Sequence, residues 1–415
     1  MTSQYGSDTK ASDNARGYVR APKLQARFDQ AAGALLDSDG WVDPQGQKKL
    51  VADMALEGGG VKGIALVGAV LALDEAGYSF ARVAGTSAGA IVATVIAALT
   101  KAKRPMTELK IHLDGLQFSK FMSKGRLRHL FEHTGKIGVT AADAIVLTRQ
   151  MGLHSGDYLE EWLGPILTGL GADTFDKLKI TLEEDPGMNL PEDHRYRLVL
   201  HVSDITRGRL VQLPWDYKYY GLGADTESVV SAVRASMSIP FFFDPVTKQA
   251  NPADVELPQP GGSTARQHYA GGAVTWVDGG LLANFPIDAF RRTDDQPPRW
   301  PTIGIRLSSL TRDFPSTFAC TDAIAVGMRC IHTLLNEWDV HNIDQTTGAR
   351  TIFVDNAGLS ATQFLLTEAQ KQQLFLNGVH AATKFVIQMA AGGRVPRSDE
   401  EARAFLLQHD ERGAD

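Results

Sequence analysis

The sequence predicts an α/β fold in three layers, with a central, mostly parallel sheet flanked by helices. The chain has 415 residues and 43% apolar content, enough for a large, well-filled core. A short apolar run, Val51 to Leu56, is followed by a helical pattern over Lys62 to Glu75 and by a second apolar run at Phe80 to Ala84. Such a β–loop–α–β unit is nearly always a right-handed crossover between two parallel strands.

Apolar runs between turn signals predict the remaining strands. In order, they are Tyr196 to Ile205, Leu210 to Leu213, Val274 to Val277 and Thr302 to Leu307. Helical spacing is found over Leu24 to Leu36 and over Ser228 to Met237, and the sequence after Leu307 is mostly helical. We interpret the apolar run Ala88 to Leu99 as a buried helix, because it falls well short of the ~20 residues needed to cross a bilayer.

One stretch, Val246 to Ala273, has neither a helix nor a strand pattern. It is rich in proline and glycine, so we expect a long loop insertion beside the candidate functional site, which lies at the carboxyl-terminal edge of the predicted sheet. Either this loop is an insertion without a function, or it is a flap that controls substrate entry.

These elements divide the chain into four parts. We expect a flexible polar tail over residues 1–20, a helical lead-in over 21–50, one large α/β domain over 51–390 and a charged appendage over 391–415. Within the appendage, Ser398 to Glu401 resembles a capping box that opens a short helix.

Composition bears on partners and on compartment. A net charge of −6 and a pI near 6.0 leave no global basic field to attract nucleic acid or anionic lipid. The N-terminus lacks the apolar core of a secretory signal, and Cys320 and Cys330 stand too far apart to meet across helical turns. We therefore expect a reduced, cytoplasmic protein whose membrane contact is at most peripheral.

Two glycine-rich motifs occupy the two loops of the first β–loop–α–β unit. Gly85-Thr86-Ser87-Ala88-Gly89 is a G-x-S-x-G serine elbow, and Gly58-Gly59-Gly60-Val61-Lys62-Gly63 precedes it. Parallel strands bring both loops to the same, carboxyl-terminal edge of the sheet. The small residues of the elbow let a strand bend sharply into a helix and push the serine outward. The triglycine exposes amides that can stabilise an oxyanion, so the motifs predict a serine acyl hydrolase.

A third motif supplies a carboxylate. Asp278-Gly279-Gly280 follows the predicted strand 274–277, and Asp278 would reach the same edge as Ser87 if this strand runs parallel to the other two. A carboxylate of ordinary pKa ~3.9 is a poor base for a hydroxyl, so the site must raise that pKa by desolvation or rely on oxyanion stabilisation. The alternative role for Asp278 is that of an Asx-turn residue entering the two glycines.

Two other enzyme classes share parts of this pattern. The glycine loop also fits G-x-G-x-x-G, but the Asp or Glu that a dinucleotide site needs ~20 residues later is absent. A Ser–Asp–His triad of the α/β-hydrolase type is the nearer rival, although its oxyanion loop lies several elements before the nucleophile. The histidines that follow Asp278 in the order of such a triad are His332, His341 and His380.

Two cationic features have open interpretations. Lys62, at a helix start, opposes the macrodipole, which hints at an oxyanion or a phosphate nearby, yet solvated lysines also occur there. Phe118 to Lys136 interleaves aromatic and basic residues. This suits either an interfacial helix pair that docks on anionic lipid or a helix packed on the core with a solvated basic face. No metal site is evident, and the predicted chemistry needs no cofactor.

Together the motifs resemble those of patatin-like phospholipases, lipid acyl hydrolases that use a serine and an aspartate. Gly58 to Gly63 corresponds to the family's oxyanion loop, Gly85 to Gly89 to its nucleophile elbow, and Asp278 to Gly280 to its Asp-Gly-Gly/Ala motif, with Asn284 and Pro286 following. Further segments similar to family blocks are Arg234 to Pro240, Gly358 to Leu366 and Gly378 to Phe385. The resemblance spans about Val51 to Met389.

The resemblance implies a patatin-like fold and a role for each motif residue. Ser87 is implied as the nucleophile and Asp278 as the base that takes its proton directly. Gly58, Gly59, Gly60 and Ala88 are implied as the oxyanion hole, with Lys62, Gly63, Gly85, Gly89, Gly279 and Gly280 in support. The implied substrate is a phospholipid, lysophospholipid or other acyl-ester lipid, with no nucleic acid as a partner. A hydrolase that is silent until an activating ligand or partner binds is the alternative.

Overall fold

The computed structural model describes residues 16–43, 46–121, 152–154, 156–185, 187–258, 263–292, 298–307, 345–359 and 365–410, with single positions 326, 330, 333 and 363. Several expectations from the sequence fall outside these residues. They are the polar tail up to residue 15, Cys320, His332, His341 and the part of the aromatic and basic stretch from residue 122 to 136.

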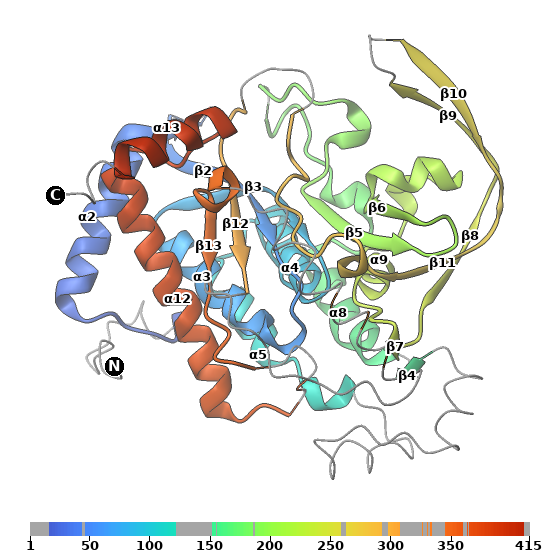
Figure 1. The fold of residues 1–415 in the computed structure, drawn as a ribbon, viewed down its shortest axis with the longest axis horizontal. Helices are drawn as coiled ribbons and strands as arrows, with labels where there is room; N and C mark the ends of the chain where they lie inside the picture. The colour runs from blue at the N-terminus through green and yellow to red at the C-terminus, as the bar shows by residue number, and fades with distance from the viewer. Residues whose placement is uncertain are drawn as a thin grey trace.

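A nine-stranded mixed sheet forms the centre of the molecule, with strand order β13-β12-β2-β3-β5-β11-β8, β1 beside β2, and β6 beside β5 (Figure 1). The strands of this sheet are β1 (Trp41–Val42), β2 (Lys48–Leu56), β3 (Tyr78–Gly85), β5 (Leu198–Asp204), β6 (Arg209–Leu213), β8 (Val246–Ala250), β11 (Gly272–Asp278), β12 (Thr302–Arg306) and β13 (Thr351–Phe353). From β13 to β5 the neighbours on this path run parallel, whereas β11 runs antiparallel to both β5 and β8.

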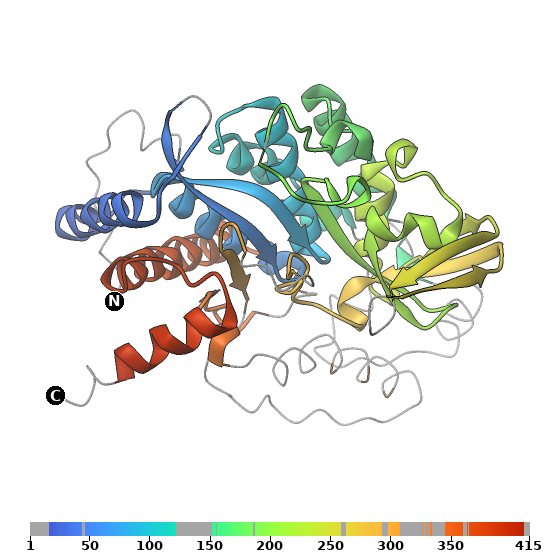
Figure 2. The same ribbon diagram turned by 90° about the horizontal axis from the view of Figure 1, so that it is seen from above.

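Helices cover the sheet on both faces, as Figures 1 and 2 show. The α-helices are α2 (Pro22–Asp39), α3 (Ile64–Glu75), α4 (Ala88–Ala102), α5 (Glu108–Asp114), α8 (Asp157–Leu170), α9 (Val229–Ser236), α11 (Gln345–Gly348), α12 (Glu368–Ala391) and α13 (Asp399–Asp410). Short 3-10 helices are η1 (Gly60–Gly63), η2 (Phe118–Phe121), η3 (Phe175–Leu178), η4 (Glu192–His194), η5 (Trp215–Tyr220), η6 (Ala224–Thr226) and η7 (Gly279–Leu281). The predicted three-layer α/β architecture is confirmed.

Helix packing follows directly from the sequence in two places. Every residue of α4 from Ala88 to Leu99 is buried, because this helix is apolar on all sides. Helices α3 and α12 cross at a pair of glycines, where a Cβ on Gly68 would lie 2.0 Å from the Phe375 carbonyl oxygen and one on Gly378 would lie 1.9 Å from that of Ala65. Only glycine permits this close approach of two helix backbones.

The expectation of an irregular loop over 246–273 was wrong. The chain runs out through β8 and β9 (Ala253–Pro258) and returns through β10 (Thr264–Tyr269) and β11, and each outgoing strand pairs with a returning one. Proline and glycine mark the bend between the two halves of this hairpin, since Pro252 lies between β8 and β9 and Gly271 lies between β10 and β11. All of β10 except its last residue is exposed, so it has no apolar alternation to recognise. Another short sheet joins β4 (Gly152–His154) to β7 (Phe241–Phe243).

Both ends of the described chain pack on the body. Helix α2 buries Phe28 and Leu35 in the same core as the sheet, and the Ser398 hydroxyl accepts the Glu401 amide at 3.2 Å, which is half of the predicted capping box at the start of α13. Within the described residues, no helix combines the length and the apolar character that crossing a membrane requires. The proposed domain limits stay predictions.

Candidate active site

Ser87 lies at the sharp turn between β3 and α4. Its backbone has φ 54° and ψ −121°, a strained conformation for a residue with a side chain. The turn is tight because a Cβ on Gly85 would lie 2.3 Å from the Gly89 carbonyl oxygen, and one on Gly89 would lie 2.3 Å from that of Leu56. The two glycines of the G-x-S-x-G motif are thus required by close backbone approach, and they hold the serine in the geometry of a nucleophile elbow.

The glycine loop after β2 lies against this serine. A Cβ on Gly58 would be 3.0 Å from the Ser87 Cβ, and one on Gly63 would be 3.1 Å from the Ala88 Cβ. The sequence prediction that parallel strands bring the two loops to one edge of the sheet is therefore confirmed, since β2 and β3 pair in parallel up to Leu56 and Gly85.

One of the four predicted oxyanion donors is already engaged. The Gly58 amide donates to the Asn284 carbonyl at 3.0 Å, so it is not free to donate to an oxyanion. The backbone hydrogen bonds of the described residues leave the amides of Gly59, Gly60 and Ala88 unused. Gly60 and Ala88 are also the first residues of η1 and α4, and the first amides of a helix have no acceptor within it.

Asp278 ends β11, which runs in the opposite direction to β3. Strand β11 is antiparallel to β5, which runs parallel to β3, so the parallel direction that the sequence analysis set as its condition is not found. The register nevertheless brings the two residues together, because Asp278 pairs with Val202 of β5 and Gly85 pairs with the nearby Leu200. Sequence patterns give the position of a strand and leave its direction undetermined, so this geometry was not predictable.

Burial makes Asp278 a weaker acid than an ordinary aspartate. Its side chain is inaccessible, and desolvation raises its pKa from 3.8 to about 7, against the opposing effects of the Ser87 hydroxyl and the Gly280 amide. Oδ1 accepts the Gly280 amide at 2.8 Å, whereas the buried Oδ2 makes no hydrogen bond of normal geometry to a described residue. Asp278 thus combines a near-neutral pKa with a location beside Ser87 and an oxygen, Oδ2, that has no hydrogen-bond partner of normal geometry among the described residues.

Two buried side chains behind Ser87 had no role predicted from the sequence. The Ser236 hydroxyl accepts the Ser87 amide at 3.1 Å and donates to the His201 carbonyl at 2.7 Å, which links the elbow to β5. The His201 ring lies near Ala283 and Gln212, at 3.4 and 3.2 Å, and burial lowers its pKa to about 4. Ser236 belongs to a block that resembled the family, whereas no sequence signal marked His201.

Asn284 joins the aspartate segment to the glycine loop. Its side-chain amide donates to the Gly58 carbonyl at 3.0 Å, which complements the backbone hydrogen bond from Gly58 to Asn284. The Ala283 carbonyl next to it accepts the Thr86 hydroxyl at 3.3 Å. The segment after Asp278 therefore contacts both the elbow and the glycine loop.

A buried charged cluster lies under the glycine loop. Glu57, the residue before the loop, accepts Arg306 Nε at 3.0 Å and the Leu307 amide, which ties the ends of β2 and β12 together. Burial raises the pKa of Glu57, and the charge of Arg306 opposes this shift. Lys62 is also buried, so the interpretation as a solvated lysine was wrong; desolvation lowers its pKa and the charge of Glu57 opposes the shift.

No histidine completes a triad in the described part of the chain. None of its histidines hydrogen bonds to Ser87 or affects the pKa of Asp278. His380 lies on α12, and burial lowers its pKa. Among the same residues, no three His, Cys, Asp or Glu side chains are grouped so that they could hold a metal ion.

A known protein family matches the region that holds these three loops. A family model described as patatin-like phospholipase matches residues 54–291, which include the glycine loop, the elbow and the Asp278 motif. The chain is 30% identical over 336 residues to the uncharacterized protein YqhO of Bacillus subtilis (strain 168), a match that covers 81% of this chain and 98% of that protein. Among solved structures, VipD from Legionella pneumophila matches with a TM-score of 0.40 and 15% identity, covering 84% of this chain and 69% of that one.

Proposed function

Because the chain belongs to the patatin-like phospholipase family, we propose that it is a lipid acyl hydrolase that cleaves fatty acyl esters through Ser87 and Asp278. The observation that carries this proposal is the meeting of a strained serine with a buried carboxyl whose pKa is about 7, next to unused backbone amides. A base of that pKa is half ionised near neutral pH, where general-base catalysis is most effective.

In the proposed reaction, the Ser87 oxygen attacks the ester carbonyl carbon while Asp278 takes the hydroxyl proton. The amides of Gly59, Gly60 and Ala88 then bind the negative oxygen of the tetrahedral intermediate. Loss of one such donor typically costs about 3 kcal/mol of barrier, so three of them offset part of the weakness of a carboxylate base. The intermediate collapses with cleavage of the bond to the leaving alcohol, which receives the proton from Asp278.

Hydrolysis of the acyl-enzyme repeats these steps with water. Asp278 takes a proton from the water as it attacks the acyl carbon, and it returns the proton to Ser87 when the fatty acid leaves. Deacylation by an alcohol in place of water would transfer the acyl group. Phospholipids and lysophospholipids are the proposed substrates, and neutral acylglycerols are the alternative.

The test is turnover on defined lipids by the purified protein. Phospholipid, lysophospholipid and neutral ester substrates are compared for the native chain, Ser87→Ala and Asp278→Asn. Matched controls remove the same groups elsewhere: Ser231→Ala takes a hydroxyl from α9, and Asp74→Asn removes another carboxyl whose pKa burial raises, to about 6. We expect both site variants to lose turnover by a factor of about a thousand or more and both controls to retain it.

A covalent serine probe separates an inactive enzyme from a silent one. A fluorophosphonate should label the native chain and leave Ser87→Ala unlabelled. Labelling without turnover would favour the alternative of a hydrolase that waits for an activating ligand. Full turnover by Ser87→Ala would contradict the proposed function.

A further inference from the structure

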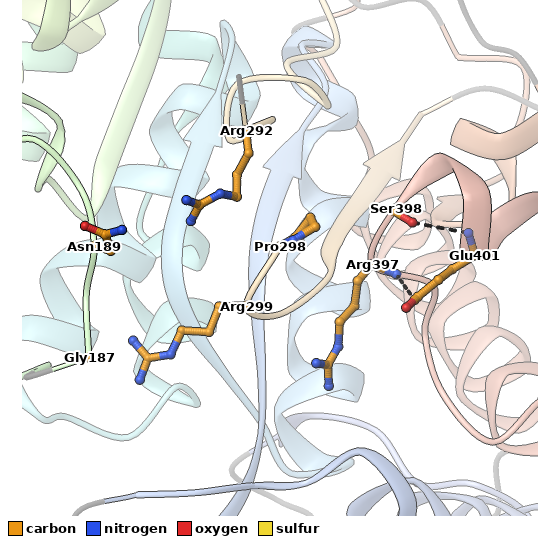
Figure 3. Close-up of a pocket in the computed structure, with 8 residues that line it drawn as sticks. All are labelled: Gly187, Asn189, Arg292, Pro298, Arg299, Arg397, Ser398 and Glu401. Carbon is orange, nitrogen blue, oxygen red and sulfur yellow. Dashed lines mark hydrogen bonds between the residues drawn. The ribbon is translucent and has the colours of Figure 1, made fainter. Parts of the chain in front are cut away.

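A cavity of about 420 Å³ lies away from Ser87 and has a different chemistry. Three arginines, Arg292, Arg299 and Arg397, line it together with one carboxylate, that of Glu401 (Figure 3). Its volume falls in the range of about 300–1,000 Å³ that is typical of small-molecule sites. Asn189 and Ser398 add neutral polar groups to the wall.

The register of the sheet separates this cavity from the catalytic loops. Arg299 comes just before β12, whose first residue, Thr302, pairs with Asp53 near the middle of β2. The glycine loop follows the other end of β2, where Leu56 pairs with Ile305 near the end of β12. The cavity therefore lies toward the amino-terminal edge of the parallel strands, and a ligand there would not occupy the ester site.

Two of the arginines, Arg299 and Arg397, have guanidinium nitrogens that no described residue uses. Arg299 uses a single nitrogen, Nη1, to bind both Asp185 oxygens at 2.7 Å, which leaves its Nη2 and Nε without a partner among the described residues. Arg397 binds Asp39 through Nη2, whereas its buried Nε has no hydrogen-bond partner in the described chain. A guanidinium edge with free N–H groups can bind an anion through two parallel hydrogen bonds.

Among the described residues that line the cavity, the carboxylate is that of Glu401, and it already has partners. Glu401 accepts the Arg397 amide at 2.8 Å and forms an ion pair with Arg394 at 3.1 Å. Its charge is therefore offset from outside the cavity, and it competes little for the guanidinium groups of the wall.

Two tryptophans hold one guanidinium in place. Arg299 lies 5.2 Å from the Trp41 ring and 4.6 Å from the Trp300 ring, and these two rings pack edge to face. A smaller adjoining cavity of about 160 Å³ shares Arg299 and Arg397 with the first and is also lined by both tryptophans. Stacking on aromatic faces orients the planar fork before any ligand arrives.

We propose that this cavity binds the phosphate group of a small phosphorylated ligand. Arginine forks match the geometry of phosphate oxygens, and Arg299 and Arg397 each have guanidinium nitrogens that no described residue uses. The phosphate can belong to a soluble compound or to the headgroup of an acidic phospholipid. Both sources offer the same chemistry to the arginines.

The test measures binding in a Ser87→Ala background, so that its result is independent of turnover and of the proposed hydrolase function. Calorimetric titrations use inorganic phosphate and glycerol 3-phosphate, and sedimentation uses phosphatidylcholine vesicles with and without phosphatidic acid. Arg299→Gln should weaken binding about tenfold or more, the effect of one hydrogen bond to a charged group. Arg266→Gln removes an exposed arginine of β10 and should leave binding unchanged.

Asp185→Asn provides a test of opposite sign. It releases Arg299 Nη1 from its carboxylate partner, so binding should become severalfold tighter, an outcome that a misfolded variant could not give. Binding of the soluble probes, or of acidic vesicles alone, supports the proposal and identifies the source of the phosphate. The proposal is overturned if no probe binds, or if neither the Arg299 nor the Asp185 variant changes the affinity.

Discussion

Replacing Asp278 with Asn should remove a pH-dependent loss of stability from the folded protein. The pKa of Asp278 is about 7 in the fold against an ordinary 3.8, so the folded chain holds a proton that the unfolded chain releases. By linkage, the free energy of unfolding then falls as the pH rises from 3.8 to about 7. Asn carries no charge, so the variant lacks this fall.

The size of the effect follows from the two pKa values. The interval from 3.8 to about 7 is roughly three pH units, and each unit corresponds to ~1.4 kcal/mol. Ionised Asp278 therefore costs the native fold about 4 kcal/mol at pH above 7. That is a large share of the ~5–15 kcal/mol by which a typical domain is stable.

Urea unfolding across a pH series measures this effect directly. The difference in unfolding free energy between Asp278→Asn and the native protein should grow by about 4 kcal/mol between pH ~4 and pH ~8, in favour of the variant. Asp288→Asn, which removes a carboxylate whose side chain is 63% exposed, should give a curve parallel to the native one. Ser87→Ala should move the fall to higher pH, because the Ser87 hydroxyl lowers the pKa of Asp278. A pH-independent difference for Asp278→Asn would refute the reasoning.

Four further predictions concern the site and its support. The rate constant kcat/KM should rise with pH through about 7, because Asp278 must be ionised to act as a base, and a pH-rate profile measures this. Gly89→Ala should lower the free energy of unfolding by about 3 kcal/mol or more in urea, because its Cβ would lie 2.3 Å from a backbone oxygen, whereas Gly33→Ala in the open interior of α2 should raise it by about 0.5–1 kcal/mol. Asn284→Ala leaves the Gly58 carbonyl without its buried donor, so steady-state kinetics should show kcat reduced about tenfold with little change in KM. Glu57→Gln breaks a buried ion pair and should cost about 3–5 kcal/mol by urea unfolding; a loss under 1 kcal/mol would contradict the buried cluster.

The local parts of the site were predictable from the sequence because each of them is formed by consecutive residues. The turn around Ser87 needs small neighbours, and the β–loop–α–β unit fixes the handedness that brings the glycine loop beside it. The motif at Asp278 was recognisable for the same reason. Its role as a base remains a prediction.

The long-range parts were not predictable. Ser236 holds the Ser87 amide from 149 residues away, and Arg306 reaches Glu57 across 249 residues, so no local spacing announces either contact. The antiparallel direction of β11 could not be predicted, because apolar periodicity does not show in which direction a strand runs. The hairpin over 246–273 was missed although β9 alternates apolar and polar residues from Ala253 to Leu257, because proline and glycine residues interrupt the segment and β10 is exposed along almost its whole length.

The bridge between Asn284 and Gly58 spans 226 residues of the chain. On the ribosome, Ser87 therefore emerges well before Asp278 and Asn284 are made. Under the proposed function, a nascent chain holds a nucleophile without its base, and hydrolytic power arrives only after β11 has docked beside β5. Under the same proposal, the order of synthesis delays lipid hydrolysis until after β11 has been made.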